Sequence, residues 1–144
     1  NEIYAVFSTQ EEVGLRGART AAYAIQPDMG IALDVTLSND YPMNKKGVTP
    51  SKLGGGAAIK VMDSSVIAHP AVKSAMEEAA KKAGVPYQFE VLTGGGTDAG
   101  AIHLTGGGVP SGTLSVPCRY VHAPCEMVDI SDLEACVGLL VALL

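Results

Sequence analysis

Short apolar runs alternate along this 144-residue chain with segments of helical spacing, and no other feature constrains the fold as much. Short apolar runs without a polar alternation are typical of strands buried in a sheet. Such runs occupy residues 3–8, 29–35, 57–62, 87–92 and 112–116, while helices are predicted at 14–25, 71–83, 97–104 and 132–144. The order predicts an α/β fold in which helices cover both faces of a sheet.

Signals at the ends of segments sharpen these predictions. The helix at 71–83 follows His69-Pro70 and stops before Gly84, and its apolar residues share one face. The last helix is predicted to start at Asp132, because Ser131 and Glu134 form an S-x-x-E capping box. Residues 3–35 read as a strand-helix-strand unit, and the polar stretch 36–56 reads as a long loop.

Composition narrows the class of protein and of partner. Hydrophobic residues make up 47% and charged residues 17%, which favours one folded domain with an aliphatic core. The net charge of −5, without any cluster of Lys or Arg longer than a pair, argues against nucleic acid and against an anionic membrane surface. The longest apolar run, residues 137–144, is far shorter than the roughly 20 residues that span a bilayer.

Cysteine usage indicates the compartment. Cys118, Cys125 and Cys136 are odd in number, and their spacing matches neither a disulfide framework nor a CxxC zinc site. We therefore predict free thiols and a cytoplasmic protein.

Acidic and imidazole side chains follow several of the predicted strands. Glu11 and Glu12 come after the first, Asp34 lies near the end of the second, and His122 follows the strand at 112–116. In such sheets chemistry gathers beyond the carboxyl ends of the strands. Carboxylate oxygens and an imidazole nitrogen form a ligand set suited to zinc, cobalt or manganese. Of two adjacent glutamates, one can bind the metal while the other accepts a proton from metal-bound water.

Structural interpretations of these residues stay open at this point. Taken alone, Glu11-Glu12 is more typical of a helix start, where carboxylates are favoured. Asp34 fits either a metal ligand or a hydrogen-bonded structural residue equally well. His69, before a proline, and His103, on an apolar helical stretch, fit structural roles better than ligation.

Two glycine clusters, at residues 54–56 and 94–96, allow the backbone to approach a ligand closely. Neither matches a phosphate-binding Walker A loop, and no GxGxxG opens a helix after the first predicted strand. Nucleotide binding is therefore disfavoured. No G-x-S-x-G elbow supports a serine nucleophile.

Four stretches in order carry a resemblance to a known family. They are QEEVGLRGA at 10–18, ALDV at 32–35, GGGTDAGAIHLTGGGVPSGTLSVP at 94–117 and RYVHAPCEMVD at 119–129. Together they resemble the glutamyl aminopeptidase, tetrahedral aminopeptidase and "cellulase M" family of co-catalytic metallopeptidases, and the resemblance covers essentially the whole chain.

The resemblance implies a three-layer zinc-peptidase-like fold with a mixed sheet, and two divalent ions, zinc or cobalt, that help to hydrolyse the N-terminal peptide bond of short peptides. It makes Glu11 the general base, Glu12 and His122 ligands of one ion, and Asp34 a ligand of the other. Thr97 and Asp98 would line the substrate side of the cleft.

Part of the family's pattern is missing from these residues. Family members also use a histidine and a bridging aspartate that precede the QEE motif, and only Glu2 stands upstream here as a possible ligand. We therefore expect residues 1–144 to be the C-terminal part of a catalytic domain, a partial domain without the N-terminal segment and without the inserted domain that builds homo-oligomers. Such a chain alone should bind metal weakly and show little activity, because catalytic zinc usually has three protein ligands.

Two other classes of function remain as alternatives. Paired carboxylates also cleave sugars, so a cellulase-type glycoside hydrolase is one, although adjacent residues poorly suit an opposed pair roughly 5–10 Å apart. The second is a non-catalytic binding or assembly module with a vestigial acidic cleft.

Overall fold

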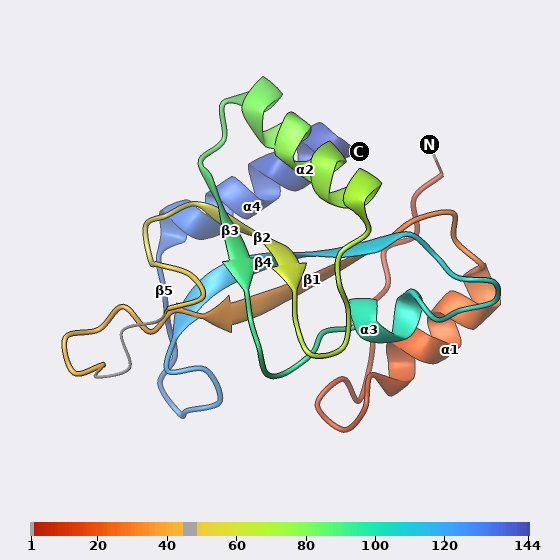
Figure 1. Cartoon of the computed structure of the whole chain (residues 1–144), viewed down its shortest axis with the longest axis horizontal. Helices are drawn as coiled ribbons and strands as arrows, with labels where there is room; N and C mark the ends of the chain where they lie inside the picture. The colour runs from red at the N-terminus through yellow and green to blue at the C-terminus, as the bar shows by residue number, and fades with distance from the viewer. Residues whose placement is uncertain (1, 45–48) are drawn as a thin grey trace.

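A computed structural model describes residues 2–44 and 49–144 of the chain. From residue 14 onward its helices and strands follow the predicted alternation, apart from a short strand at residues 127–128 that was not predicted (Figure 1). The helices are α1 (Arg16–Ile25), α2 (Pro70–Ala83), α3 (Ala99–Ile102) and α4 (Ile130–Leu143), and the strands are β1 (Gly30–Leu37), β2 (Ala57–Met62), β3 (Tyr87–Val91), β4 (Ser111–Arg119) and β5 (Met127–Val128). In this described part of the chain, no helix has the length and apolar character to cross a membrane.

The five strands form one mixed sheet in the order β1-β4-β2-β3, with β5 paired to β4. β1 runs parallel to β4, and β2 runs parallel to β3, whereas β2 and β4 are antiparallel. Helix α2 joins the parallel neighbours β2 and β3, which makes this the strand-helix-strand unit of the structure. Because β1 and β4 are parallel neighbours, their carboxyl ends lie side by side at the same end of the sheet.

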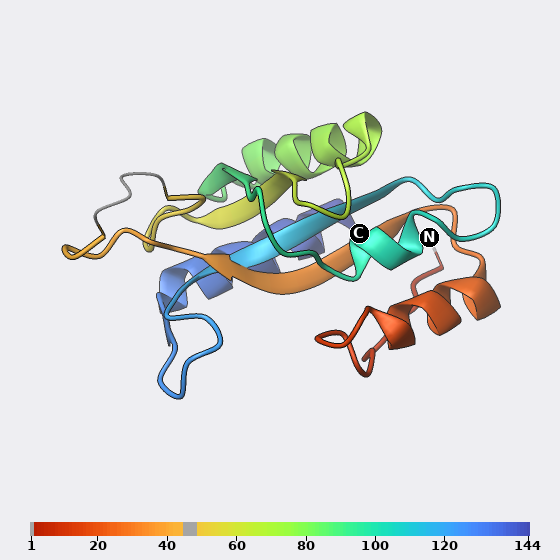
Figure 2. The same ribbon diagram turned by 60° about the horizontal axis from the view of Figure 1, so that its bottom comes forward.

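Helices cover both faces of the sheet, as predicted. α2 and α4 pack on one face, where the main core joins residues of both helices to β2 and β4. α3 covers the other face, where Ala99 packs on Ala32 of β1, and α1 packs against α3. Figure 2 shows α2 on one side of the sheet and α1 on the other.

Helix α2 ends at Ala83, as the sequence predicts. Helix α4 begins at Ile130, two residues before its predicted start at Asp132. His69 caps α2 by accepting a hydrogen bond from the Ala71 backbone N–H, and Gly84 ends it in the left-handed conformation at φ 67°. The predicted capping box of α4 is wrong: Asp129 is the cap, and its carboxylate accepts from the backbone N–H and the hydroxyl of Ser131. The Asp129 carboxylate, two residues before Ser131, accepts a hydrogen bond from a backbone N–H of the first turn, so Asp129 occupies the cap position that was predicted for Ser131.

The predicted strand at residues 3–8 is absent, and with it the predicted strand-helix-strand unit of residues 3–35. Its apolar side chains are exposed instead, and Phe7 is 95% exposed. A strand forms only against a partner that takes up its backbone hydrogen bonds, and the described residues offer this segment none.

The glycine cluster at 54–56 is held by helix α4. The buried Asp132 carboxylate accepts from the Gly54 N–H at 2.8 Å and from the Gly56 N–H at 2.7 Å. These two donors are therefore occupied inside the protein and are not free for a ligand, as the sequence alone had allowed.

A buried ion pair joins the central strand β2 to the edge strand β3. Lys60 of β2 and Glu90 of β3 are 2.6 Å apart and almost fully buried, and the Thr36 hydroxyl of β1 donates to the same Glu90 oxygen, Oε1. This polar cluster lies on the face of the sheet that carries Asp34, since alternate residues of a strand share a face.

Candidate functional site

Glu11 and Glu12 lie in a turn that precedes helix α1. The Glu11 carbonyl accepts hydrogen bonds from the N–H groups of Gly14 and Leu15, at 3.1 and 2.9 Å. The helix begins at Arg16, its N-cap Leu15 makes no side-chain hydrogen bond, and its first turn holds no acidic residue. The two carboxylates therefore do not cap the helix, and their side chains are available for other contacts.

Asp34 lies within β1, on the face covered by α3. Its carboxylate Oδ1 accepts from the Val35 N–H at 2.7 Å. Burial raises the pKa of Asp34, while the Val35 N–H and the charge of Lys60 act in the opposite direction. The position is three residues before the end of the strand, further inside the sheet than the sequence indicated.

His122 lies in the loop after β4, beyond the end of the sheet at which β1 also ends. Its Nε2 lies 3.0 Å from Oε1 of Glu12, and about 70% of each side chain is exposed. A carboxylate oxygen and an imidazole nitrogen from distant parts of the sequence are thus already in contact. Both predicted ligands of one ion lie together.

The electrostatics place Glu11 in the same cluster. The pKa of Glu11 is raised by burial first, and then by the charges of Asp34, Asp98 and Glu12, while His122 lowers it. The charges of three other carboxylates thus oppose ionisation of Glu11, and a bound cation would offset them.

The described residues do not form a complete metal site by themselves. Across residues 2–44 and 49–144, no three His, Cys, Asp or Glu side chains converge closely enough to hold a metal ion. The ligand atoms of Glu12, His122 and Asp34 are of the kinds that bind divalent ions such as zinc. Glu12 and His122 are in contact with each other, whereas Asp34 stands apart as a single ligand.

The two residues predicted to line the cleft have different surroundings. Thr97 is buried, and its hydroxyl lies 2.9 Å from that of Thr113 on β4. Asp98 is partly exposed and accepts a hydrogen bond from Ser8 of the N-terminal segment. Asp98 also acts on the pKa of Glu11 and Asp34, so it borders the acidic cluster. Thr97, in contrast, contacts strand β4 through Thr113.

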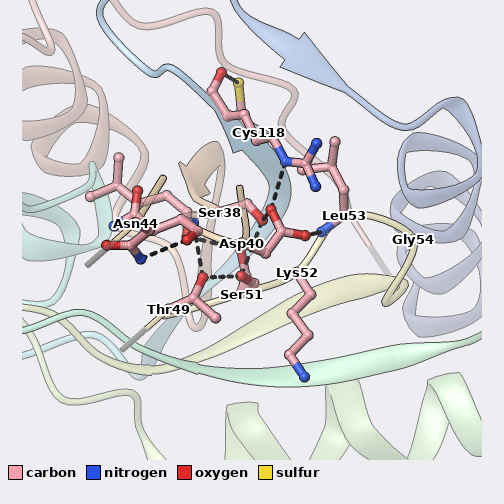
Figure 3. A network of polar contacts seen from close by, with 12 residues as sticks. Ser38, Asp40, Asn44, Thr49, Ser51, Lys52, Leu53, Gly54 and Cys118 are labelled. Atoms are coloured by element: carbon pink, nitrogen blue, oxygen red, sulfur yellow. Dashed lines mark hydrogen bonds and ion pairs between the residues drawn. The ribbon is translucent and has the colours of Figure 1, made fainter. Parts of the chain in front are cut away.

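Asp40 and Arg119, which sequence reasoning missed, fix the base of the His122 loop. Arg119 Nε donates to Asp40 Oδ1 at 2.7 Å, and Asp40 also accepts from the Ser38 hydroxyl and the Leu53 N–H. These bonds hold the pKa of Asp40 down to about 2. Figure 3 shows Asp40 among the polar contacts that join Ser38, Ser51 and Leu53. Arg119 opens the RYVHAP stretch, so its position three residues before His122 was the available signal.

The remaining two histidines contact backbone atoms at helix ends, and two of the three cysteines are buried. His69 caps α2, and His103 lies 3.0 Å from the Ala99 carbonyl oxygen through its Nδ1. All three cysteines are free thiols, as predicted, and burial raises the pKa of Cys136 to about 11.

Comparisons with known proteins agree on one family. The model of the family described as M42 glutamyl aminopeptidase matches residues 1–139. The chain is 41% identical to a lysyl aminopeptidase of Pyrococcus furiosus over 144 residues, which is 99% of this chain and 40% of that protein.

Solved structures give the same result. An aminopeptidase of the archaeon Desulfurococcus kamchatkensis matches with a TM-score of 0.90 and 45% identity, over 94% of this chain and 38% of that one. The Pyrococcus horikoshii TET1 peptidase, described as able to assemble into a tetrahedron or a large octahedral shell, matches with a TM-score of 0.80 and 35% identity, over 95% and 39%. The chain thus spans about two fifths of the length of these relatives.

Proposed function

The chain belongs to the M42 glutamyl aminopeptidase family, and on this premise we propose that it supplies part of the active site of a metal-dependent aminopeptidase. The reaction is hydrolysis of the N-terminal peptide bond of short peptides. The observation that carries the proposal is the 3.0 Å contact between Glu12 and His122, next to Glu11, whose pKa is raised. That contact pairs two ligand atoms next to a candidate base.

In this proposal Glu12 and His122 hold one divalent ion and Asp34 holds the second. Zinc and cobalt both accept this mixture of carboxylate and imidazole ligands. Ions held by these residues would supply Lewis-acid chemistry, which activates water as a nucleophile and polarises a carbonyl group. The acidic cluster would draw the ions in, because its carboxylates otherwise repel one another.

Glu11 is the proposed general base. A base works best when its pKa lies close to the working pH, and burial together with Asp34 and Asp98 moves the pKa of Glu11 upward. The carboxylate accepts the proton of the attacking water and passes it to the leaving amine. Asp98, at the border of the cluster, would contact the peptide, and Thr97 would hold the start of α3 from behind.

Residues 1–144 are proposed to form the C-terminal part of the catalytic domain. The support is their coverage of only about two fifths of the relatives' length and the lack, among the described residues, of any three side chains that could hold one ion together. The remaining ligands would come from the rest of the full-length protein, which we also propose to be a homo-oligomer, as the name of the TET1 relative suggests.

Hydrolysis of leucyl-, glutamyl- and lysyl-anilides by the full-length protein, with zinc or cobalt, tests this function. Glu11→Gln should lower kcat by about 10²–10⁴-fold, the usual contribution of a general base. Glu134→Gln, at an exposed position of α4, is the matched control and should leave kcat unchanged. No hydrolysis of any of the three substrates by the unmodified protein would reject the proposal.

The same experiment separates the alternatives. If Glu11→Gln leaves every activity unchanged, the cleft is a binding or assembly module. Cellulose cleavage that resists a chelator would instead indicate a glycoside hydrolase.

A further inference from the structure

The loop that carries His122 has an unusual backbone. Tyr120 and His122 both adopt positive φ angles, 61° and 64°, although neither is glycine. Side chains disfavour this left-handed conformation, so a loop keeps it only where other contacts hold it. Two such residues, separated by one, therefore need a specific support.

Glu126 provides a contact of the required kind. Its Oε1 accepts a hydrogen bond from the His122 backbone N–H at 2.7 Å, and the Ala123 N–H donates to the Tyr120 carbonyl at 2.9 Å to close the turn. The other oxygen, Oε2, lies 4.0 Å from the Cys118 Sγ at the end of β4. One carboxylate thus spans from the left-handed residue to the sheet.

The consequence concerns where the imidazole points. The His122 ring reaches Glu12 from a loop in which about 70% of the His122 side chain is exposed, so burial does not fix its direction. Arg119 and Asp40 anchor the start of the loop, three residues earlier. The bond from Glu126 acts on the backbone of His122 itself.

We propose that Glu126 is a positioning residue for His122: by accepting the His122 N–H, it holds the left-handed turn that aims the imidazole at Glu12. The role of His122 as a ligand rests on the proposed function above, whereas the geometry of the turn does not. Glu126 itself touches neither metal nor substrate in this proposal.

Two substitutions separate this role from simple charge or stability effects. Glu126→Ala removes the acceptor, whereas Glu126→Gln keeps an acceptor oxygen and removes the charge. Glu134→Ala removes a carboxylate from an exposed position of α4 and is the matched control. All are made in the 144-residue chain, and circular dichroism confirms that each variant is folded.

The readouts are hydrogen exchange at the His122 amide and nuclear Overhauser contacts between the His122 ring and the Glu12 side chain. Glu126→Ala should speed exchange about tenfold, the loss of one hydrogen bond to a charged group, and should remove the ring contacts. Glu126→Gln should restore most of both, and Glu134→Ala should change neither. Unchanged exchange and contacts in Glu126→Ala overturn the proposal, and so does a Glu126→Gln variant that behaves like Glu126→Ala.

A zinc titration of the unmodified full-length protein and of the same variants made in it keeps the two hypotheses apart. If zinc shifts the His122 ring signals of the unmodified full-length protein, Glu126→Ala should weaken that response, and an equal response in both proteins counts against positioning. If zinc moves no ring signal even in the unmodified full-length protein, the ligand role of His122 fails. The exchange and contact data would still decide the role of Glu126.

Discussion

Nε2 of His122 lies 3.0 Å from Oε1 of Glu12, and this contact joins the two loops that carry the candidate ligands of one ion. Because about 70% of each side chain is exposed, the pair should contribute at most about 1 kcal/mol to stability. His122→Ala should therefore change urea unfolding of the chain little, while it lowers the zinc affinity of the full-length protein by at least about tenfold.

His69→Ala is a control that should change stability but not zinc affinity. It removes the cap of α2 and should cost about 1 kcal/mol of stability with zinc affinity unchanged. Equal zinc affinity of the His122→Ala and unmodified proteins, measured by calorimetry, would argue against His122 as a ligand.

The Asp40–Arg119 pair should make stability depend on pH in a defined window. The pKa of Asp40 is about 2 in the folded chain, below the value near 4 of an unfolded aspartate, mainly because of the hydrogen bond from Arg119. The stabilisation is therefore fully present above about pH 4 and is lost as the pH falls toward 2. The difference in unfolding free energy between the unmodified chain and Asp40→Asn should shrink over that window.

The measurement is urea unfolding at several pH values between 7 and 2. Glu134→Asn, at an exposed position of α4 without a partner of this kind, should show no such change. A difference for Asp40→Asn that stays constant down to pH 2 would mean that the pair is not formed in solution.

The buried Lys60–Glu90 pair should respond to single and double substitutions in different ways. Lys60→Met leaves the Glu90 carboxylate, which is 0% exposed, without its cation and should cost about 3–5 kcal/mol. Adding Glu90→Gln removes the stranded charge and keeps an acceptor for Thr36, so the double variant should recover most of the loss. Denaturant unfolding of all four proteins measures this coupling, and additive losses would contradict it.

Gly56 and Gly84 give a matched pair of left-handed glycines. A Cβ at Gly84 meets nothing within 4 Å, so Gly84→Ala should cost only the conformational penalty of about 1–2 kcal/mol. A Cβ at Gly56 would lie 2.2 Å from the Pro86 carbonyl oxygen and would strain the loop that Asp132 holds. In thermal or urea unfolding, Gly56→Ala should lower the free energy of unfolding by about 1–3 kcal/mol more than Gly84→Ala does. Equal losses of stability would contradict the close approach of Gly56 to the Pro86 carbonyl.

Segments with complete local signals were predictable from the sequence. The strand at 57–62 has its predicted bounds, and α2 differs by one residue, because Pro70 and Gly84 mark its ends chemically. The strand at 3–8 and the α4 capping box were wrong for physical reasons that lie outside the local pattern. The first lacks a neighbouring strand among the described residues, and in the second Asp129 rather than Ser131 is the N-cap, with its carboxylate accepting from the Ser131 N–H.

The candidate site was predictable in part. Glu11, Glu12, Asp34 and His122 could be singled out because their residue types and their places after apolar runs are visible in the sequence. The contact of His122 with Glu12 depends on the fold that brings the turn before α1 to the loop after β4, and on a left-handed backbone at His122, neither of which leaves a local mark in the sequence. Asp40 and Glu126 were missed for the same reason, since their partners are set by the loops.

The open outer edge of β1 has a practical consequence for anyone who purifies this chain. Among the described residues β1 ends the strand order of the sheet, and Leu33 of β1 is 60% exposed. A strand with one edge unpaired and an exposed apolar side chain is a template on which other molecules can add. Sedimentation of the purified chain should therefore show association that grows with concentration, and Leu33→Lys should suppress it.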